Sequence, residues 1–89
     1  MAELISMKNI GKDLYMKLFA VGITTAEQLI ETGSKKAYVL LKMSYPELCA
    51  VHLYALEGAI TGVDFLDLTD EKCEELSQFA ASLEYKSKI

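Results

Sequence analysis

Apolar positions recur at helical spacing along the chain, and no stretch shows the strict alternation that is typical of a strand. Within residues 12–21 the apolar side chains at positions 14, 15, 18 and 21 form one stripe, and residues 25–32 and 34–43 are also expected to be helical. Residues 45–61 are apolar nearly all round, which is typical of a central, buried helix. The pattern therefore predicts an all-α protein.

The ends of the first two predicted helices carry recognisable signals. Gly22 suits the left-handed residue that ends a helix, and Ile23 can pack back against that helix. The run from Thr25 to Gln28 matches a capping box, so it predicts the start of the second helix, which Gly33 ends.

Similar signals bound the next two predicted helices. Ser34 is placed to cap the third helix. The run Ser44–Glu47 reads as a second capping box with Pro46 in the first turn, where no N–H is needed. These residues predict a fourth helix over 45–61, ended by Gly62, with a core that includes the apolar positions 53, 56 and 60.

The last part of the chain predicts a connector and one more helix. The connector, residues 63–68, carries Phe65 and Leu66, which we expect to be buried. Thr69 caps the final helix, whose apolar side consists of Cys73, Leu76, Phe79, Ala80 and Leu83. We expect residues 85–89 to fray. A short helix around residues 3–7 completes a compact single domain (1–89, core about 7–83) of about five helices.

Composition and charge limit the classes of function that are expected. The 89 residues are 52% hydrophobic and 25% charged with one proline, as expected of one small globular domain. The net charge is −4 and arginine is absent, whereas dedicated nucleic-acid binders are usually basic and use arginine. Charge is uneven: residues 1–43 carry a net +2 and residues 44–89 a net −6. An anionic partner is therefore expected to meet the N-terminal half.

The N-terminal turn has the pattern of a helix-hairpin-helix motif. A short helix, the turn around Ile10 and a helix ending in Gly22–Ile23 follow one another, and such a turn presents free N–H groups that attract phosphate. The candidate phosphate or nucleic-acid contacts are Lys8, Asn9, Gly11, Lys12 and Lys17. Asp13 opposes an anion there, so the alternative is a turn that only packs the first helices together.

Four segments occur in the order found in the C-terminal domain of TfoX/Sxy proteins: Asn9–Lys12, Ala20–Thr25, Gly33–Tyr38 and Leu53–Ala59. The chain resembles that domain over about residues 7–83, and the Leu-Tyr-Ala-Leu-Glu-Gly-Ala string is the most specific part. The resemblance implies a part in regulating natural competence and transcription.

The predicted central helix carries one acid and a stripe of small residues. Glu57 is expected to be a structural buried acid, because an acid on an apolar helix is costly unless it is hydrogen-bonded or paired. The stripe consists of Ala55, Gly58, Ala59 and Gly62 and lets another helix approach closely. That helix can belong to the same chain or to the partner in a homodimer.

Candidates for catalysis are few. Cys49, His52 and Cys73 could form a reactive thiolate or begin a zinc site, but they lack ligand spacing, and we expect both cysteines to be buried. We expect no catalytic residue, metal, cofactor or small-molecule substrate, no membrane span, and a cytoplasmic protein. The leading hypothesis is a small non-enzymatic regulatory or adaptor module that binds a protein partner or a second copy. The alternative is weak, sequence-nonspecific nucleic-acid binding through the turn.

Overall fold

The computed structural model describes residues 3–87, with side chains described through residue 83. The elements in chain order are η1 (Leu4–Ser6), α1 (Lys12–Ala20), α2 (Ala26–Thr32), α3 (Ser34–Ser44), α4 (Ala50–Thr61), η2 (Phe65–Asp67) and α5 (Asp70–Ser87), where η marks a 3-10 helix. The only strand-like pairing within residues 3–87 is an isolated bridge between Glu3 and Thr25. The all-α prediction is confirmed.

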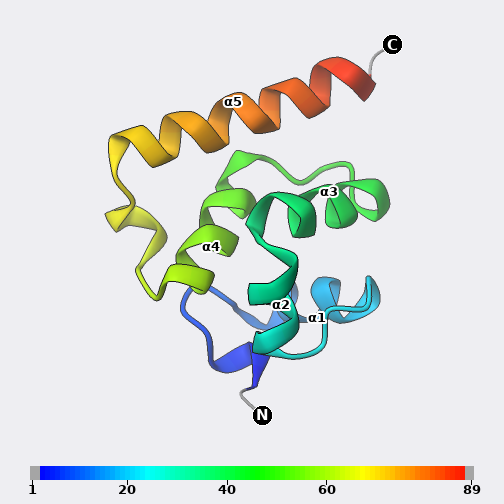
Figure 1. Ribbon diagram of the computed structural model, residues 1–89. Coiled ribbons are helices and arrows are strands. Elements are labelled where there is room, and N and C mark those ends of the chain that lie inside the picture. Colours follow the sequence, from blue (N-terminus) through cyan, green and yellow to red (C-terminus); the bar gives the residue numbers. More distant parts are fainter. Residues whose placement is uncertain (1–2, 88–89) are drawn as a thin grey trace.

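Helix α4 occupies the centre of the fold. In Figure 1, α3 runs beside α4, α5 crosses one end of the pair, and η2 lies on the outer side of α4. Leu53 and Leu56 of α4 are fully buried, and Ile60 packs partly buried against the same core. The apolar character of α4 on nearly all sides follows from this position, because neighbouring elements cover most of its surface.

The predicted ends of α1 and α2 are confirmed. Gly22 has φ +92°, and its N–H bonds the Phe19 carbonyl at 3.1 Å. The Ile23 N–H reaches back to the Leu18 carbonyl at 2.9 Å, which completes a Schellman motif. The side chain of Thr25 accepts from the Gln28 N–H at 3.1 Å, as the capping box requires.

The predicted start of the fourth helix is wrong. Helix α3 continues through Ser44, so the run Ser44–Glu47 does not form a capping box, and α4 begins at Ala50. The Lys42 ammonium donates to the carbonyls of Pro46 and Leu48, which holds the connection in a non-helical path. Leu48 is buried in the core. Burial of this side chain and the lysine contacts outweigh the local capping signal.

Two further boundaries differ from the sequence prediction. Gly33, with φ +86°, is the N-cap of α3, and Ser34 is the first helical residue rather than the cap. At the other end, Thr69 caps α5 as predicted by accepting from the Lys72 N–H at 3.2 Å. Helix α5 continues through Ser87, into the segment expected to fray, and residues 88–89 lie outside the described residues.

The central position of α4 predicts a large effect of truncating its buried leucine. Leu56→Ala is expected to lower the free energy of unfolding by ~2–5 kcal/mol, because the side chain is fully buried and leaves a cavity. Urea denaturation followed by circular dichroism measures this loss. Met43→Ala, at a position 77% exposed, is the control and should stay within about 0.5 kcal/mol of the wild type. Equal urea midpoints for Leu56→Ala and Met43→Ala would contradict the assignment of Leu56 to the core.

Candidate functional site

The N-terminal turn is built around Asn9, whose backbone is left-handed with φ +69°. Its side-chain amide donates to the Val63 carbonyl at 3.0 Å and to the Ala55 carbonyl at 3.3 Å. Its side-chain oxygen accepts from the Phe65 N–H at 3.2 Å. The Asn9 side chain therefore links the turn to the end of α4 and to η2, and it is directed into the chain rather than toward an external phosphate.

The small-residue stripe lies against the same contact. A Cβ atom at Gly58 would lie 2.5 Å from the Val63 carbonyl oxygen and would also collide with the Asn9 amide. Ala59 is buried, and Gly62 ends α4 with a left-handed backbone of φ +80°. Gly58 thus provides room for the chain's own turn and connector.

The lysines of the turn differ in whether they are paired with another residue of the chain. Lys8 and Lys12 are exposed, and Gly11 is the N-cap of α1 without a side-chain capping bond. Lys17 pairs with Asp13 at 2.5 Å and lies 5.4 Å from the centre of the Tyr45 ring. The hydrogen bond to Asp13 raises the pKa of Lys17 above its ordinary value. The turn therefore leaves two exposed lysines near the start of α1.

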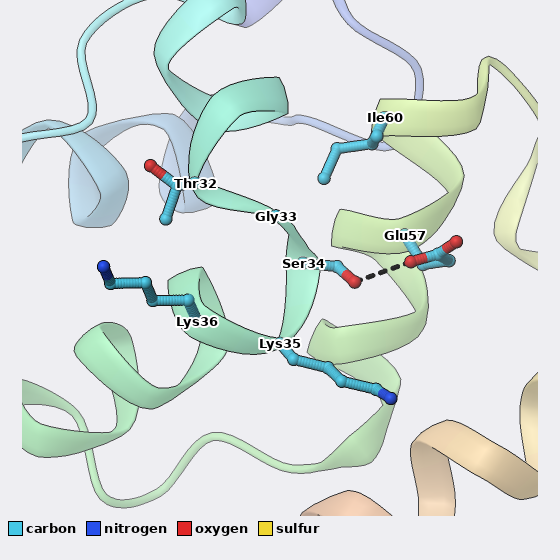
Figure 2. A pocket seen from close by; sticks show the side chains of 7 residues that line it. All are labelled: Thr32, Gly33, Ser34, Lys35, Lys36, Glu57 and Ile60. Atoms are coloured by element: carbon cyan, nitrogen blue, oxygen red, sulfur yellow. Dashed lines mark hydrogen bonds between the residues drawn. The ribbon is translucent and has the colours of Figure 1, made fainter.

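Glu57 connects α4 to the start of α3. The Ser34 hydroxyl donates to the Glu57 carboxylate at 2.6 Å, and Ser34 is itself buried (Figure 2). An open hollow of about 420 Å³ lies beside the pair and is lined by Thr32, Gly33, Ser34, Lys35, Lys36, Glu57 and Ile60. A partly buried carboxylate at this position is compensated by the hydroxyl and by its place near the positive end of α3.

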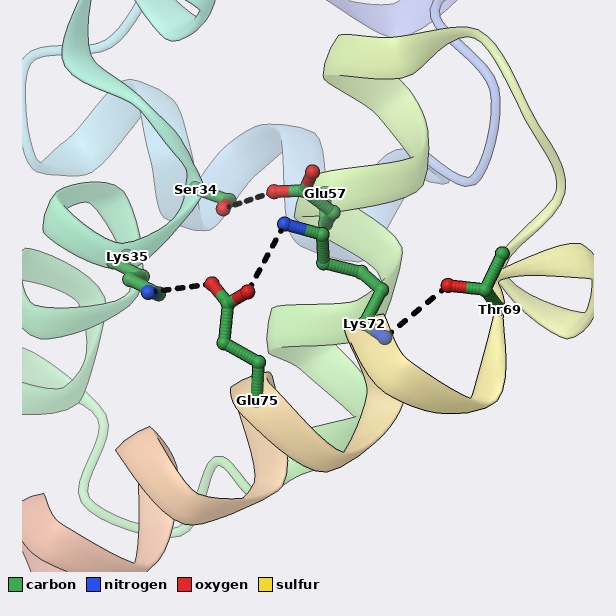
Figure 3. A network of polar contacts seen from close by, with 6 residues as sticks. All are labelled: Ser34, Lys35, Glu57, Thr69, Lys72 and Glu75. Atoms are coloured by element: carbon green, nitrogen blue, oxygen red, sulfur yellow. Dashed lines mark hydrogen bonds and ion pairs between the residues drawn. The ribbon is translucent and has the colours of Figure 1, made fainter.

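A second polar cluster attaches α5 to α3. Glu75 pairs with Lys35 at 2.6 Å and with Lys72 at 3.3 Å (Figure 3). The Lys35 ammonium also lies 5.6 Å from the centre of the Phe79 ring. The hydrogen bond from Lys35, followed by that from Lys72, lowers the pKa of Glu75 below its ordinary value. Because these groups are substantially exposed, the pairs position α5 more than they stabilise it.

The cysteines are less buried than predicted. Cys49 is exposed at the N-cap of α4, and Cys73 is half-buried on α5, so the expectation that both are buried is wrong. The Cys49 N–H donates to the His52 ring at 3.2 Å, and the thiol lies 3.8 Å from the same nitrogen. This pair caps the helix. Among the described residues, no three His, Cys, Asp or Glu side chains gather as a metal-binding group.

Exposed apolar side chains occur on several elements, among them α1 and η2. Met16 and Phe19 of α1 are 59% and 54% exposed, and with Tyr15 they line an open hollow of about 240 Å³. Leu66 of η2 is 78% exposed, so the prediction that it is buried is wrong, while Phe65 is half-buried. Asp64 and Asp67 flank residues 65–66, and these acids are the sequence signal that could have indicated a turn exposed to solvent.

The described helices include none that is long and apolar enough to cross a bilayer.

Comparison with known proteins identifies a family and two similar structures. The family model of the TfoX C-terminal domain matches residues 1–80. A crystal structure of an uncharacterized protein from Listeria monocytogenes, in a triclinic form, shares 40% identity with a TM-score of 0.91, covering 93% of this chain and 94% of that one. A tetragonal form of a protein of unknown function from the same organism shares 40% identity with a TM-score of 0.82, covering 84% and 92% respectively. No curated protein matches the chain.

The three hydrogen bonds of Asn9 predict a stability cost when its side chain is removed. Asn9→Gly keeps the left-handed backbone and is expected to lose ~1–3 kcal/mol of unfolding free energy, because three hydrogen bonds are lost and two of them are partly buried. Asn9→Ala should lose about 1 kcal/mol more, because alanine is disfavoured at positive φ. Urea denaturation measures both, with Lys8→Ala as the exposed control. An unfolding midpoint of Asn9→Gly equal to that of the wild type would show that the contacts carry no net stability.

Proposed function

The chain belongs to the TfoX C-terminal domain family, and from that premise we propose that it is a small non-enzymatic regulatory or adaptor module. It acts through contacts with a protein partner or with a second copy. The observation that carries this proposal is the outward display of Phe19 and Leu66 by a small domain whose other leucines are buried or half-buried. Exposed apolar side chains on rigid elements are a common feature of protein-binding surfaces.

The polar residues support the same role. Asn9 and Glu57 are engaged by partners inside the chain, which favours a structural use of both side chains. The Cys49–His52 pair serves as a helix cap. A cytoplasmic location is part of the proposal, since an exposed thiol such as Cys49 stays reduced there. Regulation of competence and transcription is the process that the family suggests.

The proposal is tested by comparing protein partners of matched surface variants. Wild type, Phe19→Ser, Leu66→Ser and Ile30→Ser are used as baits, and Ile30 is a suitable control because it is 53% exposed on α2. A true partner is retained by wild type and Ile30→Ser and lost with one of the other two variants. Titration with the purified partner should then show affinity at least about tenfold weaker for that variant. Equal retention by all four baits would contradict the proposal.

Weak nucleic-acid binding is the second candidate, and one observation favours it. Lys8 and Lys12 are exposed beside the start of α1, where Gly11 leaves the first N–H groups of the helix without a side-chain cap. Such N–H groups attract phosphate. Asp13 lies in the same turn and opposes an anion, so we expect the binding to be weak and blind to sequence.

Fluorescence anisotropy with a short DNA duplex tests this second candidate. Two phosphate contacts predict a slope of log K against log salt of about −1.8, so binding should nearly vanish at physiological salt. Lys12→Glu should abolish the residual binding, whereas Lys36→Glu, the same change on α3, should leave most of it. Tight, sequence-selective binding that survives physiological salt and is lost in Lys12→Glu would instead make DNA the main partner.

A further inference from the structure

Leu66 stands at the tip of a short, rigid projection. The Asp64 carboxylate accepts from the Leu66 N–H at 2.9 Å, and the Asn9 side chain accepts from the neighbouring Phe65 N–H at 3.2 Å. These bonds hold the backbone of the η2 turn, which carries the exposed leucine. Asp64 and Asp67 flank it. We call Leu66 with these two aspartates the acidic knob.

The exposed face of α1 offers the opposite combination. Tyr15, Met16 and Phe19 line the open hollow of about 240 Å³. Lys12 is exposed on the same face as Met16, because residues four apart are neighbours on a helix. We call these three apolar residues with Lys12 the α1 groove. Its apolar floor suits the leucine of the acidic knob, and Lys12 suits the aspartates because the nearby Asp13 carboxylate is already paired with Lys17.

The acidic knob and the α1 groove lie on opposite sides of the molecule. In Figure 1 the yellow η2 turn is at the left edge, whereas α1 is at the right, with α4 and α2 between them. The knob of one chain therefore cannot enter its own groove. The charge of the two halves of the sequence, net +2 for residues 1–43 and net −6 for 44–89, also favours contact between unlike ends of two chains.

From this geometry we propose that the Leu66 knob of one molecule inserts into the α1 groove of a second copy. The proposal rests on the proposed function and names its partner as the same protein. The contact joins two different surfaces, so every copy keeps one knob and one groove, and the assembly grows head to tail or closes into a ring. A contact this small is weak, with a dissociation constant on the order of 0.1–1 mM, and salt weakens it further.

Sedimentation velocity over rising protein concentration tests the contact. The wild type and the control Ile30→Ser should sediment faster as concentration increases. Phe19→Ser removes the floor of the groove and Leu66→Ser removes the knob, so each variant alone should weaken association at least about tenfold. Both positions are more than half exposed, and a circular dichroism spectrum equal to that of the wild type confirms that each variant is folded.

Mixing the two variants is the decisive measurement. Phe19→Ser keeps an intact knob and Leu66→Ser keeps an intact groove, so an equimolar mixture should form a one-to-one complex although neither variant associates alone. A contact between identical surfaces predicts no such rescue. A mixture that stays monomeric, a wild type that stays monomeric, or an equal loss in Ile30→Ser overturns the proposal. If a different protein still binds the wild type and Ile30→Ser but not Phe19→Ser or Leu66→Ser, the proposed function remains supported although self-association is excluded.

Discussion

The side chain of Asn9 joins parts of the chain that are about fifty residues apart, and the arrangement of the N-terminal turn, α4 and η2 depends on it. Its amide and its oxygen reach Val63 and Phe65, and this approach is possible because position 58 is glycine. Two consequences follow from one contact. The turn that resembles a phosphate-binding hairpin directs its asparagine inward, and the η2 connector is fixed in a path that points Leu66 outward.

Features set by neighbouring residues could be predicted from the sequence, because their physical cause lies within one helical turn. The Schellman end at Gly22, the capping box at Thr25 and the cap at Thr69 are local hydrogen-bond patterns of this kind. The start of α4 could not be predicted in this way. Ser44–Glu47 carries a valid local signal, but burying Leu48 in the core draws the connection out of a helical path.

In the candidate site, too, local features could be predicted from the sequence, whereas contacts between distant parts of the chain could not. The left-handed backbone of Asn9 follows from residue type, whereas its three partners depend on how the turn meets α4. An acid on an apolar helix predicts a partner for Glu57, and only the packing of α3 on α4 identifies that partner as Ser34. Leu66 was expected in the core because it is apolar. Its exposure depends on the orientation of a short 3-10 turn, which periodicity does not determine.

Pairing within the chain also bears on the proposal that the partner is a protein rather than a nucleic acid. Lys17 and Lys35 are held by Asp13 and Glu75, so a polyanion would have to compete with carboxylates that already occupy these cations. The net charge of −4 adds a long-range repulsion that salt screens but does not reverse. An apolar contact has no such competition. Burying the exposed apolar side chains of α1 and Leu66 releases water and lowers the free energy, and this gain does not depend on the sign of the protein's net charge. The balance of these two effects supports the proposed protein partner over nucleic acid.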